Sequence, residues 1–415
     1  MICAILLSAG FAAYLGANVT VNVNDLVGIA LKNYLERELN SSFYLLQKPC
    51  SYIISMVGSY VCLQNGTSGK LELYSTNATN IWQNGLSSSN GKTIYAKAAT
   101  YQLGDYGLTL PESIEIIGEN QVIFNYTGND WAIKTNNTNL DTGRAIIKNV
   151  NVNIEGSEIT DCKGGILLEN MTFGFLEGIS VSGGGSPSGT TTGIKIAERG
   201  GNQVTLMQCE VSGFDRGFWI TADWCLLQKC ASYTSNTGFL VDDSNTATTR
   251  PIETKLQDCL AYYPDYCGFN ISYAKGFSVV GCSYEGEAGN DATAFYFDDG
   301  DWDSGVYGFF ANPIFLDVAP STYYSFNGNM QPYALLTIVP NLKNFVTENS
   351  GTATISASTA VTFNHGLAGT PTFVMASFNS TAVDGWKWTA TSTQITITVT
   401  PTGTYKVYWT AKYTP

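Results

Sequence analysis

Two hydrophobic patterns divide this chain. Between Asp25 and Leu39, apolar residues recur at helical spacing, with Val27, Leu31 and Leu35 near one face. This spacing predicts a short amphipathic helix capped by Asp25. After residue 90 helical periodicity nearly disappears, and short strand-like runs separated by turn residues replace it. The pattern predicts an all-β protein with an N-terminal helical segment.

The strand-like runs repeat at intervals of about 22 residues, which is typical of a solenoid. Six segments align, and each has Asn or Cys at its third position: 147–154, 168–175, 207–214, 228–235, 257–264 and 280–287. The aligned residues are Asn149, Asn170, Cys209, Cys230, Cys259 and Cys282. Stacked strands place equivalent residues in rows, so we expect these side chains to form one inward row.

A second set of segments, GIKI, GFWI, GFLV, GFNI and AFYF, follows the first along the chain. The offset from Cys209 to Gly217 is 8 residues, and from Cys230 to Gly238 it is again 8. Such an offset between the two sets of segments is expected if each rung of a coil consists of one strand wall, a turn and the next strand wall. The repeats predict a right-handed parallel β-helix over residues 79–297, with the insertions at 182–192 and 242–251 forming loops outside the coil.

The segment that opens this region, from NIWQNGL to ENQVIF, resembles the first rungs of pectate-lyase-like β-helix proteins. In those proteins a short helix caps the barrel before a Gly-Thr-Tyr segment begins the coil. Here Ala99 stands in place of that first glycine, and Gly118 matches the turn glycine. The resemblance covers residues 80–297 and implies a capped β-helix.

Alternating polar and apolar residues return from Thr352 to Tyr413 and predict a small antiparallel β-sandwich over residues 350–415. Its segment VTFNHGLAGTPTFVMAS resembles a signature of C-terminal domains in phage and archaeal-virus tail-fibre and spike proteins, some of them lectin-like. Residues 298–349, which are acidic and aromatic and then punctuated by proline, are predicted to be a linker.

The N-terminal segment is apolar, and no charged residue precedes Asp25. It lacks the basic start of a secretory signal and is shorter than a membrane span, so we interpret residues 1–24 as a retained anchor to a membrane or virion base. Residues 25–78 are predicted to be a helical stem. Within it, Cys50 and Cys62 are the pair favoured for a disulfide, while the Cys row is left open between buried thiols and bridged neighbours.

The composition limits the classes of molecule that this protein could bind. Charged residues make up 13% of the 415 residues, the net charge is −13, and basic residues form no cluster, which argues against nucleic acid. Asn-X-Ser/Thr sequons favour an exported, glycosylated protein. They lie at Asn18, Asn40, Asn65, Asn77, Asn125, Asn136, Asn170, Asn270 and Asn379.

Catalytic motifs are weak. A glycosidase needs two carboxylates facing one groove, and Asp215, Asp242 and Asp243 are the weak candidates, with Asp258 and Asp265 also at predicted turns. Polygalacturonase-like members carry Asn-Thr-Asp, Gly-His-Gly and Arg-Ile-Lys motifs that do not appear here, and no arginine lies in a lyase motif.

One acidic segment is a metal candidate. Asp299, Asp301 and Asp303 alternate as in a calcium loop but depart from the EF-hand pattern, which leaves either a Ca²⁺ turn or a solvated acidic loop. No other cofactor is expected.

The resemblances imply an extracellular spike or tail-fibre protein on a virion. Because the catalytic motifs are missing, we expect an adhesin that binds a host cell-surface glycan or protein. Asn364, His365, Trp386 and Trp388 are the expected receptor contacts, although His365 also fits a turn role. The resembled families also imply a homotrimer. The alternatives are an exported polysaccharide-processing enzyme and a structural filament protein.

Overall fold

The fold is taken from a computed structural model. It describes residues 23–43, 50–89, 91–135, 143–155, 162–183, 190–197, 203–242, 251–272, 274–287, 289–298, 307–311, 313–316, 320, 322–327, 336–338, 348–367 and 369–413. The predicted anchor therefore lies almost wholly outside the described residues. Across the described part, no helix is long and apolar enough to cross a membrane. Contacts divide the chain into two compact units, residues 1–214 and 215–415.

Unit 1 begins with helix α2 (Val23–Phe43) and an antiparallel meander of β1 (Tyr52–Val57), β2 (Tyr60–Asn65) and β3 (Leu71–Ser75). Leu35 and Leu39, one helical turn apart, are buried with Cys62 and Leu71. The predicted helix is confirmed, but the predicted helical stem is wrong beyond it. The strand β1 pairs in parallel with β4 (Lys92–Ala96), so the coil begins about 27 residues earlier than expected, counting from residue 79 back to Tyr52.

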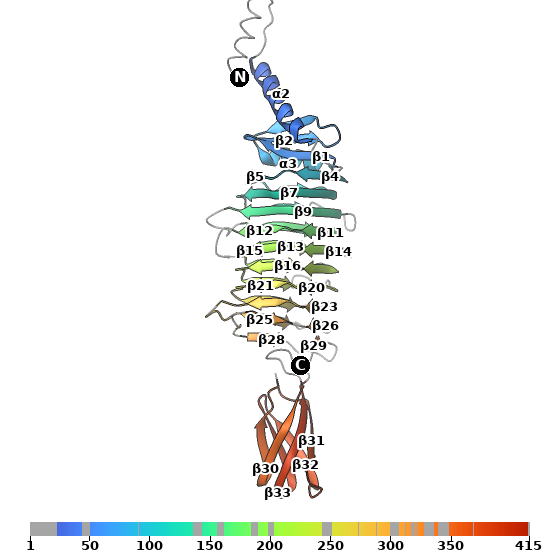
Figure 1. Ribbon diagram of the computed structural model, residues 1–415, viewed down its shortest axis with the longest axis vertical. Helices are drawn as coiled ribbons and strands as arrows, with labels where there is room; N and C mark the ends of the chain where they lie inside the picture. The colour runs from blue at the N-terminus through green and yellow to red at the C-terminus, as the bar shows by residue number, and fades with distance from the viewer. Residues whose placement is uncertain are drawn as a thin grey trace, which may run out of the picture. The chain divides into compact units, whose positions relative to one another are not determined.

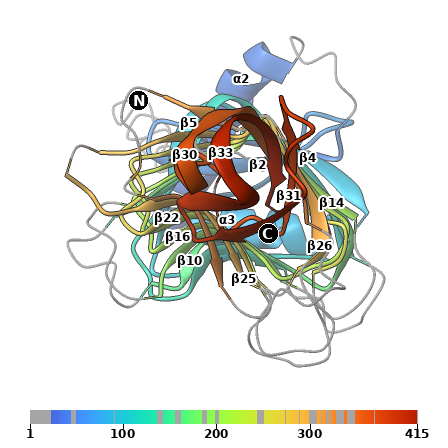
Figure 2. The same ribbon diagram turned by 90° about the horizontal axis from the view of Figure 1, so that it is seen from below.

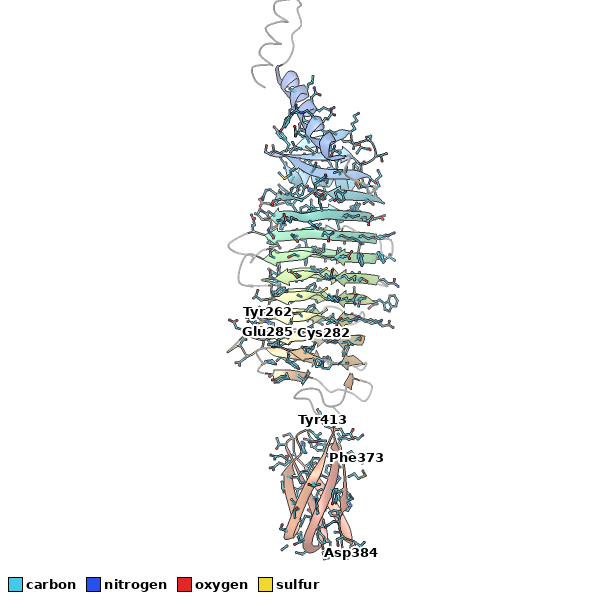
Figure 3. The ribbon with its side chains drawn as sticks, viewed as in Figure 1. Tyr262, Cys282, Glu285, Phe373, Asp384 and Tyr413 are labelled. Atoms are coloured by element: carbon cyan, nitrogen blue, oxygen red, sulfur yellow. The ribbon has the colours of Figure 1, made fainter. Side chains whose placement is uncertain are left out.

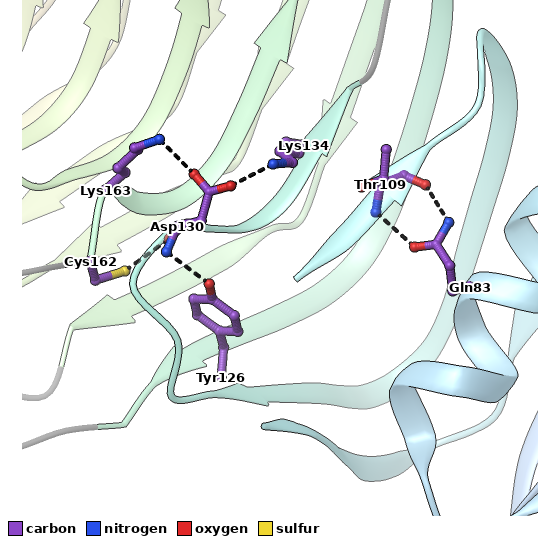
Figure 4. Close-up of polar contacts among 7 residues, drawn as sticks. All are labelled: Gln83, Thr109, Tyr126, Asp130, Lys134, Cys162 and Lys163. Carbon is purple, nitrogen blue, oxygen red and sulfur yellow. Dashed lines mark hydrogen bonds and ion pairs between the residues drawn. The ribbon is translucent and has the colours of Figure 1, made fainter. Parts of the chain in front are cut away.

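The helix α3 (Ala78–Ser87) caps the coil, as the pectate-lyase-like resemblance implied. Asn77 caps its first turn by accepting a hydrogen bond from the Asn80 amide. Trp82 is fully buried, with its ring edge-to-face with Phe124 at a centroid distance of 4.8 Å. Gln83 closes the edge of β6 (Leu108–Leu110): its amide accepts from Thr109 N and donates to Thr109 O, both at 3.1 Å (Figure 4). This side chain takes the place of a neighbouring strand.

The rungs of unit 1 have three walls of parallel strands, stacked as Figure 1 shows. The first wall contains β4, the opening parts of β7 (Ser113–Tyr126) and β9 (Gly143–Ile154), β11 (Met171–Glu177) and β14 (Gln203–Met207). The second contains β5 (Ala99–Gly104), the later parts of β7 and β9, β12 (Ser180–Gly183) and β15 (Glu210–Ser212). The third contains β6, β8 (Trp131–Thr135), β10 (Gly164–Glu169) and β13 (Thr192–Ala197).

Unit 2 repeats the three walls. The first contains β17 (Cys225–Gln228), β20 (Lys255–Gln257), β23 (Lys275–Val280), β26 (Tyr307–Ala311) and β29 (Leu336–Ile338). The second contains β18 (Ala231–Tyr233), β21 (Leu260–Tyr262), β24 (Ser283–Glu285) and β27 (Ile314–Phe315). The third contains β16 (Arg216–Ile220), β19 (Thr237–Val241), β22 (Cys267–Ser272), β25 (Thr293–Asp298) and β28 (Thr322–Asn327). In Figure 2, which looks along the stack, β16 and β22 lie across the coil from β26.

These pairings confirm the predicted parallel β-helix, for which right-twisted strands favour a right-handed coil. They also correct its end. The predicted linker over residues 298–349 contains β26 to β29, which continue the parallel pairing. The coil therefore extends to Ile338.

Seven of the described corners between the first and second walls are each turned by one residue with positive φ. In unit 1 these residues are Gln121, Asn149, Gly178 and Gln208, and in unit 2 they are Lys229, Asp258 and Gly281. The next residue points inward, which places Val150, Ile179 and Cys209 in the inward row of unit 1 and Cys230, Cys259 and Cys282 in that of unit 2.

The predicted row is thus right for the cysteines and wrong for the asparagines. Asn149 is the corner residue itself, and Asn170 precedes β11 at a different corner. Asparagine tolerates the left-handed conformation better than most residues, which explains its place there.

The row of Gly217, Gly238, Gly268 and Ala294 is confirmed. A Cβ added to Gly238 would lie 2.7 Å from the Gly268 carbonyl oxygen and 3.1 Å from the Ala261 Cβ. Next to this row the rings of Phe218, Phe239, Phe269 and Phe295 stack with centroid distances of 4.8, 4.9 and 4.9 Å. The glycines leave the room that these rings and the second wall fill.

The described cysteines are free thiols, so the predicted Cys50–Cys62 disulfide is wrong. Cys62 pairs with Ser55 across β1 and β2. Cys50 is five residues before Ser55 along an extended segment, or roughly 16 Å at about 3.3 Å per residue, whereas a disulfide needs a Cα separation below about 7 Å.

Residues 348–367 and 369–413 contain an antiparallel sheet built around β33 (Gln394–Lys412). The strand β30 (Glu348–Asn364) pairs along both halves of β33, while β32 (Gly385–Ala390) pairs with its first half and β31 (Phe373–Phe378) with its second. Register shifts after Ile355 bend β30. Phe363 from one half stacks on Trp409 from the other at 4.7 Å, so the halves form the predicted sandwich.

The crowded glycine row gives a first prediction. Gly238→Ala should lower the free energy of unfolding by about 2 kcal/mol, because the new methyl group overpacks the coil. Gly385→Ala is the control, since nothing lies within 4 Å of a Cβ there, and its effect should stay within about 0.5 kcal/mol. Urea unfolding measures both. Equal midpoints for Gly238→Ala and the parent would contradict the assigned register.

A second prediction concerns alkaline pH. Burial raises the pKa of Cys267 to about 12. This thiol stays protonated in the folded chain, while the unfolded thiol ionises with a pKa of about 8.5. Its contribution to stability is therefore complete below that pH and is lost as the pH rises toward 12, by up to about 5 kcal/mol. Cys267→Ala should therefore show a shallower loss of stability between pH 9 and pH 11 in urea titrations. An unchanged slope would exclude this role.

Candidate functional site

The predicted acidic residues do not form a glycosidase pair. Asp215 precedes β16, and the Asp242 amide bonds the Ile220 carbonyl at the other end of that strand. About six strand steps of about 3.3 Å separate the two levels, or roughly 20 Å, whereas paired glycosidase carboxylates lie about 5 to 9.5 Å apart. Asp215 already bonds Asn236 Nδ2 at 2.8 Å and lies 3.7 Å from Arg216 Nε. Asp243 lies outside the described residues.

The predicted calcium ligands Asp299, Asp301 and Asp303 also lie outside the described residues. Within the described ranges, no group of three or more His, Cys, Asp or Glu side chains is placed to hold a metal ion.

His365 serves the turn, not a receptor. Its side chain has no exposed surface, and its Nδ1 accepts from Leu367 N at 3.0 Å while Nε2 faces the Thr391 carbonyl oxygen at 3.1 Å. We therefore withdraw it as a receptor contact, because a ligand cannot reach it.

The other predicted receptor contacts are separated. Trp388 packs against the sandwich core, whereas Trp386 is 38% exposed and lies edge-on to Phe378. Asn364 is exposed and accepts from Gln394 Nε2 at 3.1 Å. Trp386 and Asn364 thus remain accessible, and their role stays a prediction.

The asparagines of the predicted glycosylation sequons differ in their exposure to solvent. Asn65, Asn77, Asn170, Asn270 and Asn379 are at least partly exposed, and their glycosylation stays a prediction. Asn125 is 8% exposed and accepts from Asn153 Nδ2 at 3.3 Å, so a glycan does not fit there once the chain has folded. Asn18 and Asn136 and the side chain of Asn40 lie outside the described part.

Another surface in unit 2 gathers aromatic and polar groups. The tyrosine corner, where the second wall turns into the third, consists of Tyr233, Tyr262, Tyr263, Tyr266, Asp265 and Glu285. Tyr233, Tyr262 and Glu285 occupy one row because β18, β21 and β24 pair in register. They alternate with inward residues such as Cys282, so they face out (Figure 3).

The rings at this corner are close together and reach solvent. The Tyr233 and Tyr262 centroids are 5.7 Å apart, and those of Tyr262 and Tyr263 are 3.9 Å apart. The backbone amide of Tyr266 donates a hydrogen bond to the carbonyl oxygen of Asn236 on the preceding rung, and the Tyr266 side chain is 61% exposed. The result is an aromatic surface with an exposed edge.

Hydrogen bonding and charge raise the pKa of one of these tyrosines, Tyr263. The hydrogen bond with Tyr262, followed by burial and the charge of Glu285, raises the pKa of Tyr263 to about 12. Tyr263 has φ +52°, a conformation costly for a bulky residue. Its neutral hydroxyl stays available as a hydrogen-bond donor or acceptor at ordinary pH.

Amides and acids extend the corner. Asn290 Nδ2 donates to the Pro264 carbonyl at 3.2 Å and to Asp265 at 3.4 Å, and Asn236 Nδ2 donates to Asp215. On the adjoining third wall the Arg216 guanidinium lies 4.2 Å from the Trp219 ring centroid. These groups surround the aromatic surface with donors and acceptors.

Such an arrangement can bind a polyhydroxylated ligand, because ring faces pack on C–H groups while amides and carboxylates bond hydroxyls. Sequence reasoning proposed Asp215 and Asp265 singly and missed the tyrosines. The signal was present: Tyr233 and Tyr262 occupy the same position relative to Cys230 and Cys259.

No protein-family model and no curated protein matches this chain. Among solved structures, the tailspike protein gp49 of Acinetobacter baumannii bacteriophage Fri1, titled a capsular polysaccharide depolymerase, is 12% identical over 81% of this chain and 82% of its own, with a TM-score of 0.36. ORF18 of Geobacillus virus E2 is 12% identical over 79% and 74%, with a TM-score of 0.39. The tailspike of Acinetobacter phage vB_ApiP_P1 is 9% identical over 81% and 85%, with a TM-score of 0.32. At these values the likenesses carry no argument about this chain's ligand or activity.

The coupling within the corner gives a third prediction. In Tyr262→Phe the pKa of Tyr263 should fall toward about 10, because the hydrogen bond that raises it is lost. NMR titration of ring-labelled tyrosine would follow Tyr263, assigned by its loss in Tyr263→Phe. At pH 11 the parent's Tyr263 should still be protonated. Titration of Tyr263 near pH 10 in both proteins would contradict the contact.

Proposed function

We propose that this protein is a virion-surface spike that attaches to a host by binding a cell-surface glycan, with the tyrosine corner as the binding site. The observation that carries the proposal is the row of Tyr233, Tyr262 and Glu285, with the exposed Tyr266 beside it. Rows of rings spaced by the strand separation suit a ligand that itself repeats, such as a polysaccharide chain.

The sequence supports the setting. Sequons and the scarcity of charge favour an extracellular protein, and the spike and tail-fibre resemblance of the C-terminal sandwich favours a virion. In this proposal residues 1–24 join the spike to its base, and Asn364 and Trp386 form a second, distal contact.

Self-association is part of the same proposal. The outer side of the C-terminal sandwich exposes Phe373 by 49%, Met375 by 57% and Tyr408 by 45%. Met375 and Phe373 belong to β31, which pairs with β33 on one side. An apolar face on such a strand favours contact with another copy, as in a homotrimer.

A depolymerase is the second candidate function. The tyrosine corner brings Asp265 and Glu285 to the same aromatic surface, so two carboxylates accompany the sugar-binding groups. Cleavage of a bound polysaccharide that is lost in both Asp265→Asn and Glu285→Gln would favour this function.

Binding gives the fourth prediction. On an array of neutral, aminated and acidic oligosaccharides, the full chain should bind at least one class, and Tyr262→Ala and Tyr266→Ala should each weaken binding about tenfold, the loss of about 1.4 kcal/mol of ring contact. Tyr106→Ala is the matched control, because Tyr106 is 75% exposed in unit 1, away from the corner residues in sequence. It should bind like the parent.

The variant Trp386→Ala distinguishes binding at the C-terminal sandwich from binding at the tyrosine corner. Loss of binding in Trp386→Ala, with Tyr262→Ala and Tyr266→Ala unaffected, would move the site to the C-terminal sandwich and refute the tyrosine corner.

A further inference from the structure

Acidic residues predominate among the described residues around the tyrosine corner. Asp215, Asp265 and Glu285 lie at or beside it, and the connection from β24 to β25 adds Glu287 and Asp291, both exposed. These acids are not grouped to hold a cation: the described residues contain no cluster of three or more metal-ligating side chains. Glu285 lies in the outward row with Tyr233 and Tyr262. Asp265 lies at the same corner, where it accepts from Asn290 Nδ2 at 3.4 Å.

Few described basic residues lie near the tyrosine corner. Between residues 215 and 298, the described bases are Arg216, Lys229, Lys255 and Lys275. Arg216 lies against Trp219 and beside Asp215. Lys255 and Lys275 belong to strands of the first wall, and Lys229 is the corner residue between the first and second walls. None of these lysines is on the corner between the second and third walls.

This distribution of charge determines which charged sugars the tyrosine corner can bind. Unit charges a few ångströms apart at a protein surface still interact through the solvent, and salt screens them over about 10 Å at 0.1 M. An acidic sugar on the tyrosine corner would meet several carboxylates. Among the described bases of residues 215–298, only Arg216, which already contacts Asp215 and Trp219, lies beside this corner. A sugar hydroxyl or ammonium group would instead donate to these carboxylates, which are strong acceptors.

We infer that the tyrosine corner selects glycans without anionic groups, namely neutral or aminated chains. This inference rests on the proposed function, because it names the ligand class of the same site. It places Glu285 and Asp265 as specificity-determining residues that reject uronic and other acidic sugars.

The test compares matched ligands. Oligogalacturonates, their carboxyl-reduced neutral counterparts and amino-sugar oligomers of equal length are offered to the full chain at 0.05 and 0.5 M NaCl. We expect the neutral or aminated forms to bind at least tenfold more tightly than the acidic form at low salt, and the difference to shrink at high salt.

Two variants assign the cause. The double variant Asp265→Asn, Glu285→Gln should reduce the discrimination several-fold while Tyr262→Ala weakens all binding. Tighter binding of the acidic form, weakened by salt, would overturn the inference and leave the proposed function standing. Binding of no class, or binding insensitive to both Tyr262→Ala and Tyr266→Ala, would overturn the proposed function and this inference with it.

Discussion

The structure depends on the stacking of equivalent residues at the separation of paired parallel strands. In a β-helix each inward side chain lies on the same position of the next rung, so every row must satisfy one steric requirement repeatedly. Glycine at 217, 238 and 268 and phenylalanine at 218, 239 and 269 meet that requirement in unit 2. The inner rows therefore admit little variation.

The corners between the walls impose a second requirement, on the backbone conformation. From β7 to β24, a single left-handed residue turns each described corner from the first wall to the second, and the following residue enters the core. Outward positions are free of this restriction, which is where Tyr233, Tyr262 and Glu285 lie. The same register that fixes the core thus aligns a surface row from residues 29 and 23 positions apart, counted from Tyr233 to Tyr262 and from Tyr262 to Glu285.

Sequence reasoning succeeded where a row repeats its residue type. The buried places of Cys230 and Cys259 and the glycine row were predictable, because small identical residues recur at constant offsets. Asn149 was misplaced by one position because a corner residue and an inward residue are neighbours in sequence. The strands β26 to β29 were missed because long insertions interrupt the period, and the meander β1 to β3 because antiparallel strands lie outside it. The tyrosine corner and the burial of His365 depend on contacts between rungs and around turns, which spacing alone does not reveal.

The amide of Gln83 has a consequence for how such a shaft changes in length. By bonding the backbone of β6 it makes the first rung of the third wall unable to accept a further strand on that side. A duplicated rung therefore cannot be added beyond β6 and must enter on the other side of this cap, where it meets the same rows. Relatives that differ by whole turns would keep this cap unchanged, and the distance between their two ends would vary in steps of one strand separation.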